Sequence, residues 1–290
     1  MSHKTQVATW WKIVVVMLAA VLVVAACSTP TAPPAPTSVP MPEVTVESSD
    51  TALTVPAEMP AGFVAVTVKN SGQSLHAPFF ARLNEGVTQD QFMQALQTDE
   101  SGAAAIALVT LLGGAQAAPG ASQRAVFNLK PGSHIALDFG DGPGQGPPQI
   151  ASFEVKASDG PAPAEPVATV NADLIDFQFA LPDQIKSGAQ TWQIENKGAQ
   201  LNSMWVLKLN EGVTVQDVLD MIISDAVPPD PSPYRVMATW MPMSAGERVW
   251  LTVDLPAGAY IVVCILLDFA SGPPKLHQEQ GMVHKLMVAE

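Results

Sequence analysis

The sequence predicts a mainly β protein made of two tandem antiparallel β-sandwich domains, each with one short inserted helix. Three observations lead to this fold class: an internal repeat, segments in which apolar and polar residues alternate, and an unusual composition. The chain has 290 residues, of which 26 are proline and 14% are charged. Globular proteins average about 5% proline and about 25% charged residues. The composition therefore favours short strands and turns over long helices.

The first 26 residues have the organisation of an export signal. Lys4 and Lys12 precede a run of 14 apolar residues, Ile13 to Ala26, without a charged or polar side chain. A membrane-spanning helix needs about 20 apolar residues, whereas a positively flanked run of about 7 to 15 is typical of a secretory signal peptide. We therefore predict a signal peptide over residues 1–26, with an uncleaved anchor as the alternative.

A cysteine follows this signal. The segment VAAC, which ends at Cys27, resembles the lipobox of bacterial lipoproteins. The resemblance implies that Cys27 carries the lipid, so that the mature protein is extracytoplasmic and anchored to the bacterial cell membrane. A plain signal peptide with an incidental cysteine is the other reading. Residues 27–43, with six prolines in the stretch 28–42, are expected to form an extended tether.

The rest of the chain contains an internal repeat. The hexapeptide LNEGVT occurs at residues 83–88 and again at 209–214, an offset of 126 residues. Chance matches would not keep one register over a long stretch, yet the same offset pairs Asp50 with Asp176 and Asn70 with Asn196. We predict two copies of one domain, a first repeat over residues 44–157 and a second over 167–290, joined by a linker at 158–166. Both repeats have the size of an ordinary single-core domain.

Each repeat is expected to consist of strands with one helix. Apolar and polar residues alternate over 63–69 and 125–129 in the first repeat and over 191–195 and 249–255 in the second, which is typical of half-buried antiparallel strands. After each LNEGV segment, a threonine lies three residues before a side chain that can complete a capping box. This spacing, Thr88 with Gln91 and Thr214 with Asp217, predicts the start of a helix.

The end of the second repeat carries a cysteine, a histidine and a methionine in a suggestive order. A predicted strand leads to Cys264, the chain returns through His277, and Gly281-Met282 opens the last strand. This order resembles the ligand loop of cupredoxins, the blue copper β-sandwich proteins. The resemblance implies a copper site with Cys264, His277 and Met282 as ligands. Thiolate, imidazole and thioether ligands together suit both oxidation states of copper.

Both repeats depart from the cupredoxin pattern. The family takes a second histidine from an earlier strand, after an Asn-x-Gly turn, but the second repeat has Asn202 there. The first repeat has this histidine, His76, but Asp138 stands where the second repeat has Cys264. Asp138 and His76 could form a structural hydrogen bond or half of another metal site. The remaining three-ligand set favours Cu(I), with Met204 as a substitute ligand or, more simply, a residue that fills the core.

Composition and motifs exclude several classes of function. With 14 basic and 27 acidic residues the formal charge is −13, so the chain lacks the basic surface that nucleic acid binding requires. No catalytic motif is present, and we do not expect an enzyme. The leading interpretation is copper binding or electron exchange at the membrane, with a redox or surface protein as partner. The alternative is a metal-free binding or scaffolding module for a protein or extracellular ligand.

Overall fold

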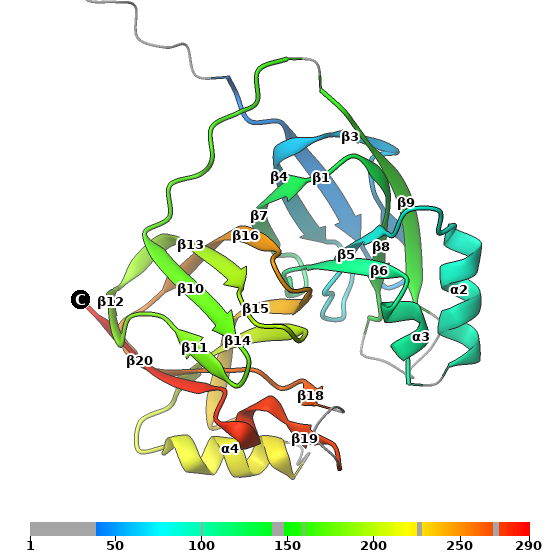
Figure 1. The fold of residues 1–290 in the computed structure, drawn as a ribbon. Coiled ribbons are helices and arrows are strands. Elements are labelled where there is room, and N and C mark those ends of the chain that lie inside the picture. Colours follow the sequence, from blue (N-terminus) through cyan, green and yellow to red (C-terminus); the bar gives the residue numbers. More distant parts are fainter. Residues whose placement is uncertain (1–38, 100, 141–147, 159, 225–227, 269–272) are drawn as a thin grey trace, which may run out of the picture. The chain divides into compact units, whose positions relative to one another are not determined.

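The computed structural model describes residues 39–99, 101–140, 148–158, 160–224, 228–268 and 273–290. The predicted signal peptide, the predicted lipid attachment at Cys27 and most of the predicted tether lie outside these residues. Residues Val39–Glu290 form one compact unit. Most of its elements are strands, with only a few short helices, which confirms the predicted mainly β fold class (Figure 1).

The first repeat contains nine strands and two helices among the described residues. They are β1 (Glu43–Ser48), β2 (Leu53–Thr54), β3 (Glu58–Pro60), β4 (Gly62–Asn70), β5 (Phe79–Leu83), α2 (Gln89–Thr98), α3 (Ala103–Ile106), β6 (Val109–Gly113), β7 (Ser122–Leu129), β8 (Gly132–Asp138) and β9 (Gln149–Lys156). The predicted capping box begins α2, because the Thr88 hydroxyl accepts from the backbone of Gln91 and the Gln91 side chain accepts from that of Thr88.

The second repeat follows the same plan with one α-helix. Its elements are β10 (Val170–Ile175), β11 (Gln178–Ala180), β12 (Gln184–Lys186), β13 (Gly188–Asn196), β14 (Asn202–Leu209), α4 (Val215–Ile223), β15 (Tyr234–Met243), β16 (Arg248–Leu255), β17 (Gly258–Val263), β18 (Leu267–Asp268), β19 (Lys275–Leu276), the 3₁₀ helix η1 (His277–Gln280) and β20 (Val283–Ala289). Thr214 and Asp217 form the predicted capping box of α4. Neither α3 nor η1 was expected, since both are too short to show a helical period.

The strands form two large sheets that run through both repeats. One has the order β11-β10-β13-β16-β7-β4-β1-β2, and the other β12-β20-β17-β14-β15-β6-β5-β8-β9-β3. Most pairs are antiparallel, as predicted. Parallel pairing joins β1 to β4 and β3 to β9 in the first repeat, and β10 to β13 and β12 to β20 in the second. These pairs occur at matching places, so the parallel strands belong to the repeated plan.

The two repeats meet along the central strands of both sheets. Strand β16 pairs with β7 and β15 pairs with β6 (Figure 1). At this seam Trp240 is fully buried, and its ring lies 5.6 Å from that of Phe127. Gly113 has a φ of +79°, and a Cβ there would lie 2.1 Å from the Trp240 indole nitrogen. Only glycine therefore allows the two repeats to approach so closely at this point.

The largest hydrophobic core lies between the sheets and includes residues of both repeats. Two smaller clusters lie between the helices and the face of the ten-stranded sheet that points away from this core. Phe92 of α2 is buried in one with Leu137, and Val218 of α4 is buried in the other with Val263. Burying a side chain such as Val218 contributes about 1.5–3 kcal/mol. These contacts hold each helix against its sheet.

Candidate functional site

The terminal loop of the second repeat brings His277 back to Cys264. Cys264 follows β17, and its backbone N–H donates to the carbonyl of Met282. The loop is pinned on its return because the N–H of His277 donates to the carbonyl of Leu266 at 2.8 Å. Gly281, with a φ of +111°, then ends η1 and directs the chain into β20. These backbone hydrogen bonds hold Cys264 and His277 close to each other although twelve residues separate them in the sequence.

Three polar side chains converge inside this loop. The Sγ of Cys264 lies 3.5 Å from Nδ1 of His277, and that same nitrogen lies 3.1 Å from Oδ1 of Asn202. All three residues are at most 1% exposed. Of the predicted site residues, the structure therefore brings together the thiol, the loop imidazole and the amide at the degenerate position.

The surroundings shift the pKa values of Cys264 and His277 in opposite directions. Burial raises the pKa of the Cys264 thiol, and hydrogen bonds from the hydroxyl and the backbone N–H of Ser203 partly oppose the rise. Burial lowers the pKa of His277, against the attraction of Asp268 and Asp176. At neutral pH the pair is therefore a neutral thiol beside a neutral imidazole, with donors from Ser203 in place to stabilise a thiolate.

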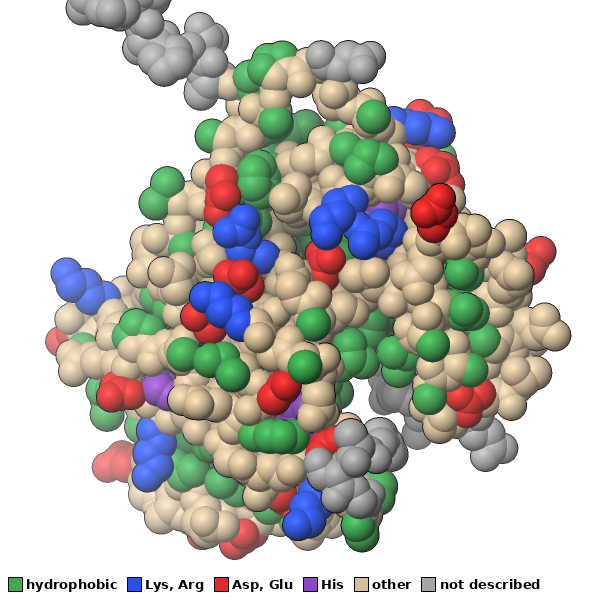
Figure 2. Space-filling view, in the orientation of Figure 1, with side chains coloured by type: hydrophobic (Ala, Val, Ile, Leu, Met, Phe, Trp, Pro, Cys, Tyr) green, Lys and Arg blue, Asp and Glu red, His purple; other side chains and the backbone are tan. Residues whose placement is uncertain are grey.

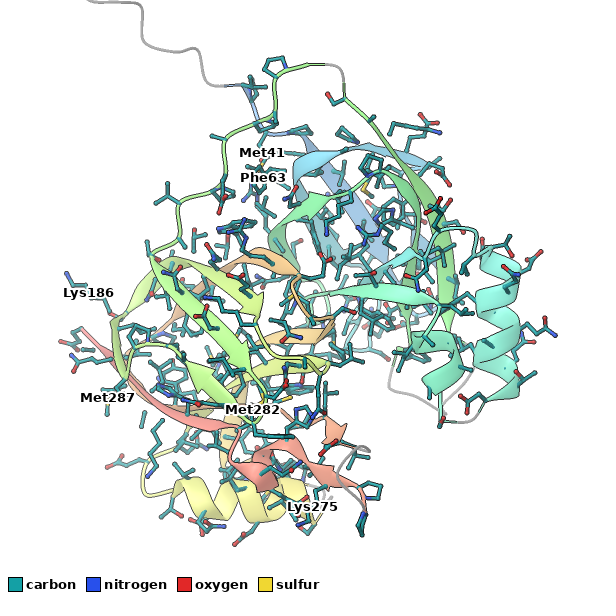
Figure 3. All side chains as sticks on the ribbon, viewed as in Figure 1. Met41, Phe63, Lys186, Lys275, Met282 and Met287 are labelled. Atoms are coloured by element: carbon teal, nitrogen blue, oxygen red, sulfur yellow. The ribbon has the colours of Figure 1, made fainter. Side chains whose placement is uncertain are left out.

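Both candidate thioether ligands are buried in the core near this loop. Met282 and Met204 have no exposed surface and belong to the same hydrophobic cluster as Cys264. Met282 lies in the interior of the repeat, whereas Met287 projects at its margin (Figure 3). Within the described ranges, no group of three or more His, Cys, Asp or Glu side chains could hold a metal ion. A metal on Cys264 and His277 would therefore need a thioether or an amide as a further ligand.

The first repeat has a different set of side chains at the same place. Nδ1 of His76 lies 2.8 Å from Asp138, and Nε2 lies 3.2 Å from Asp50. The hydroxyl of Ser48 and the backbone N–H of Gly140 also donate to Asp138. Of the two roles considered for the His76–Asp138 pair, the geometry fits the structural hydrogen bond, because carboxylates already engage both imidazole nitrogens.

A repeated hydrogen-bond scaffold supports both sites. The Asn70 side-chain NH₂ donates to the carbonyls of Ser74 and Ala117, and that of Asn196 donates to Gln200 and Met243, each 126 residues later. These asparagines also accept from Gly72 and Gly198 and so close the predicted turns. The turns fix the position of the next residues, which in the second repeat begin β14 at Asn202 and in the first repeat place His76 in an isolated bridge with Ala117 ahead of β5.

An aspartate completes the scaffold in each repeat. Asp50 accepts hydrogen bonds from the backbone of Gln73 and Ser74 and from His76, which lower its pKa to about 2. Asp176 accepts from the backbone of Ala199 and Gln200 and from Asn202, and these bonds lower its pKa although desolvation opposes them. The repeat offset paired the two aspartates, but it did not reveal that they hold the side chains of the site.

Two further residues shape the second site and carry no sequence signal. Ser203 follows Asn202; its backbone N–H donates to the Cys264 sulfur, and its hydroxyl lies 3.4 Å from the same atom. Phe177, in the turn between β10 and β11, has a φ of +63°, which is unusual for a residue other than glycine. Its ring meets that of His277 edge to face at 5.2 Å. Positive φ in a bulky residue depends on the surrounding packing and cannot be predicted from a short motif.

Comparison with known proteins gives matches among solved structures only. No protein-family model and no curated protein matches the chain. A reduced auracyanin from Roseiflexus castenholzii is 21% identical, covers 42% of this chain and 94% of its own, and has a TM-score of 0.29. Auracyanin A, a blue copper protein from Chloroflexus aurantiacus, is 20% identical over 41% and 95%, with a TM-score of 0.28.

A match that spans most of both repeats has a similarly low identity and TM-score. The copper nitrite reductase of Nitrosomonas europaea is 14% identical, covers 87% of this chain and 95% of its own, and has a TM-score of 0.25. The copper chemistry in these names is that of those proteins and is not carried over to this chain. Among the residues that the structure describes, no helix is both long and apolar enough to cross a bilayer.

Proposed function

We propose that the second repeat binds a soft metal ion, foremost Cu(I), through Cys264 and His277, and that the protein handles copper or exchanges electrons outside the cytoplasm. The observation that carries this proposal is the 3.5 Å separation of Cys264 Sγ and His277 Nδ1 in a buried site. For a tetrahedral ion such as zinc, bonds of about 2.3 Å to sulfur and about 2.0 Å to nitrogen put the two ligand atoms about 3.5 Å apart. The side chains are thus already spaced as ligands of one ion.

The donor set fits a soft ion. A thiolate and an imidazole, with the buried thioether of Met282 in the same cluster, are ligands that Cu(I) prefers. The amide of Asn202, which contacts His277 Nδ1, is a poor substitute for the imidazole that a redox-cycling copper site takes from this position. Copper, when bound, would supply a one-electron couple. The protein's own part is to desolvate the ion, to orient Nδ1 toward the sulfur and to stabilise the thiolate through Ser203.

The experiment is a copper titration of the full chain carrying Cys27→Ser, which leaves Cys264 as the only thiol. The protein is titrated anaerobically with Cu(I) against a chromophoric chelator, and separately with Cu(II) while the visible absorbance is recorded. We expect one Cu(I) per chain and its loss in Cys264→Ser. The matched control is Asp138→Asn, at the equivalent position of the first repeat, which should still bind. Less than one copper per chain, or binding that survives Cys264→Ser, would refute the proposal.

The alternative is a metal-free binding or scaffolding module. It is favoured by the first repeat, where His76 is closed off between two carboxylates, and by the fact that 3.5 Å also suits a hydrogen bond between the Cys264 thiol and His277. In that case Cys264→Ser should keep its fold and its protein partners and no copper should bind. Cross-linking and capture from native membranes would identify the partner, whereas a failure to enrich any protein would speak against scaffolding.

The export of the chain remains part of the proposal. We infer from the lipobox resemblance that a lipid on Cys27 anchors the protein to the outer face of the bacterial cell membrane. Mass spectrometry of the mature amino terminus and the membrane fraction of Cys27→Ser test this directly. A soluble mature protein that begins at another residue would exclude the anchor.

A further inference from the structure

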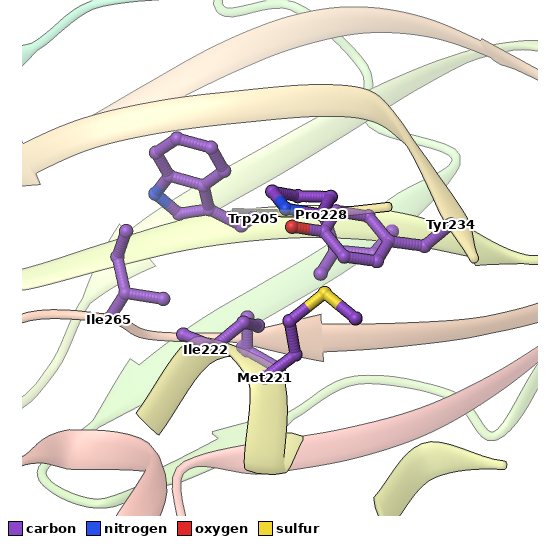
Figure 4. A pocket seen from close by; sticks show the side chains of 8 residues that line it. Trp205, Met221, Ile222, Pro228, Tyr234 and Ile265 are labelled. Carbon is purple, nitrogen blue, oxygen red and sulfur yellow. The ribbon is translucent and has the colours of Figure 1, made fainter. Parts of the chain in front are cut away.

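Each repeat contains a cavity between its helix and the sheet. In the second repeat the cavity has a volume of about 220 Å³. Met221 and Ile222 rise into it from α4, opposite Trp205 of β14 and Tyr234 of β15 (Figure 4). The lining is apolar, as expected for space beneath an amphipathic helix.

The cavity of the first repeat occupies the same place. Five of its lining residues stand 126 positions before lining residues of the second cavity. These pairs are Phe79 with Trp205, Leu96 with Ile222, Gly102 with Pro228, Leu137 with Val263, and Phe139 with Ile265. The two cavities are therefore copies of one feature, which allows them to be compared residue by residue.

The first cavity is much larger, about 980 Å³. Two differences between the repeats account for its size. The short helix α3, with Ala105 and Ile106, forms an additional wall that the described part of the second repeat lacks. The cavity also extends across the seam to the terminal loop of the second repeat, where Leu266, Leu267 and His277 line it. The face in Figure 2 is hollowed between these two parts, with hydrophobic side chains in the recess.

The two cavities differ in the size of the molecule that they can hold. Small-molecule sites occupy about 300–1,000 Å³, so the first cavity can enclose a ligand and the second cannot. Its mouth exposes two large apolar side chains, Ile106 at 41% and Leu267 at 46%. Phe79 and Phe139, whose stacked rings lie 5.9 Å apart, add aromatic surface to the lining. Exposure of such apolar surface to water is unfavourable, so an apolar molecule that covers it lowers the free energy.

Charge narrows the ligand class further. The described lining residues include two carboxylates, Asp99 and Asp268, and no lysine or arginine. Asp99 accepts hydrogen bonds from Ser101 and Ala104, and Asp268 accepts from Gln280. Among the described lining residues, an anionic head group would find no lysine or arginine and would lie near the carboxylate of Asp99. A neutral molecule avoids this repulsion.

We propose that the first cavity binds one uncharged, largely apolar small molecule, held between α2, α3 and the second-repeat residues Leu266, Leu267 and His277. The site lies in the first repeat and does not depend on the proposed metal binding. Because His277 is one of the lining residues, a bound molecule would lie near the imidazole of the candidate metal site. The class includes long-chain alcohols and neutral aromatic or isoprenoid compounds, and it excludes fatty acids.

The test uses the full chain in detergent-free buffer and the neutral fluorescent probe N-phenyl-1-naphthylamine. We expect saturable binding with one site per chain, displacement by 1-dodecanol, and displacement by dodecanoate that is weaker by about tenfold or more. Leu96→Trp, which fills the first cavity, should weaken probe binding by about tenfold or more, whereas the matched Ile222→Trp in the second cavity should change it by less than about twofold.

The outcomes are distinguishable. If Leu96→Trp does not fold, Ala105→Leu, which adds bulk from α3, serves as the second blocking variant, and near-UV circular dichroism checks each fold. No saturable binding to the wild-type chain, equal effects of the two tryptophan variants, or dodecanoate as good as dodecanol would each overturn the proposal. Because the probe needs no metal, a copper titration that fails leaves this result unaffected, and the reverse also holds.

Discussion

The two repeats place different chemistry on the same scaffold. In the first repeat the imidazole of His76 lies between two carboxylates, Asp138 and Asp50. In the second, the amide of Asn202 takes its place and an imidazole arrives from the terminal loop to meet Cys264. The scaffold around both sites is conserved to the level of single hydrogen bonds. The contrast teaches that the turn and its aspartate hold the strand in position whatever the site does, so the chemistry of the two sites can differ freely.

The largest effect is expected from breaking the buried pair of the first repeat. His76→Ala leaves the carboxylate of Asp138 buried without its imidazole partner, which should cost about 3–5 kcal/mol. Asn202→Ala, the matched change in the second repeat, removes a neutral amide and should cost about 1–3 kcal/mol. Denaturant unfolding followed by circular dichroism measures both. Equal losses would mean that Asp138 does not depend on its imidazole partner more than Asn202 depends on its own contacts.

The second effect is the pH dependence of copper binding at the second site. Because the pKa of Cys264 is raised, the thiol is protonated near neutral pH and must release its proton to the solvent when copper binds. The pKa of His277 is lowered below 6.5, so the imidazole is already neutral above that pH. Cu(I) affinity should rise about tenfold per pH unit between about pH 6.5 and 8. A flat profile from chelator competition would show that the thiol is not a ligand.

A smaller effect should follow from giving the second repeat the histidine of the first. In the first repeat Nδ1 of His76 faces Asp138, the counterpart of Cys264. Asn202→His should therefore direct a second imidazole at the thiol, with Asp176 in place to hold its other nitrogen. We expect Cu(II) affinity to rise by about tenfold and an intense visible band to appear. Asp138→Cys, the reciprocal variant, lacks the terminal-loop histidine and should show neither change.

The smallest effect concerns the serine that only the first site has. Ser48 donates to Asp138, whereas the second repeat has Leu174 at this position, 126 residues on, buried without such a role. Ser48→Ala should cost about 1 kcal/mol, because Asp138 keeps its bonds to His76 and Gly140. Thermal unfolding measures the change. A loss as large as that in His76→Ala would show that Asp138 depends on the serine as much as on the imidazole.

The sequence predicted the parts of the structure that depend on local pattern or on repetition. The capping boxes of α2 and α4 appear where Thr88 and Thr214 indicated them. The fixed offset matched His76 with Asn202 and Asp138 with Cys264, and these residues do occupy matching places in the structure. An insertion outside the repeat does not change the repeat offset, and a capping box needs only two residues three positions apart. Both features can therefore be recognised in a single sequence.

Long-range features could not be predicted in the same way. The pairing of β7 with β16 and of β6 with β15 depends on how two surfaces fit, and Gly113 carries no signal of the Trp240 ring that it accommodates. The contact between His277 and Cys264 depends on a loop closed by backbone hydrogen bonds. The roles of Ser203 and Phe177 follow from packing around that loop and not from any motif.

The seam between the repeats has a consequence for how such a chain can be divided. In an isolated repeat, β6 and β7, or β15 and β16, would each lose a neighbour and present a row of unpaired backbone N–H and C=O groups. Strands left open in this way recruit other chains, so each half made alone should be prone to aggregate. The duplication thus protects each half from self-association, and the pair persists as a unit even where the two sites have diverged.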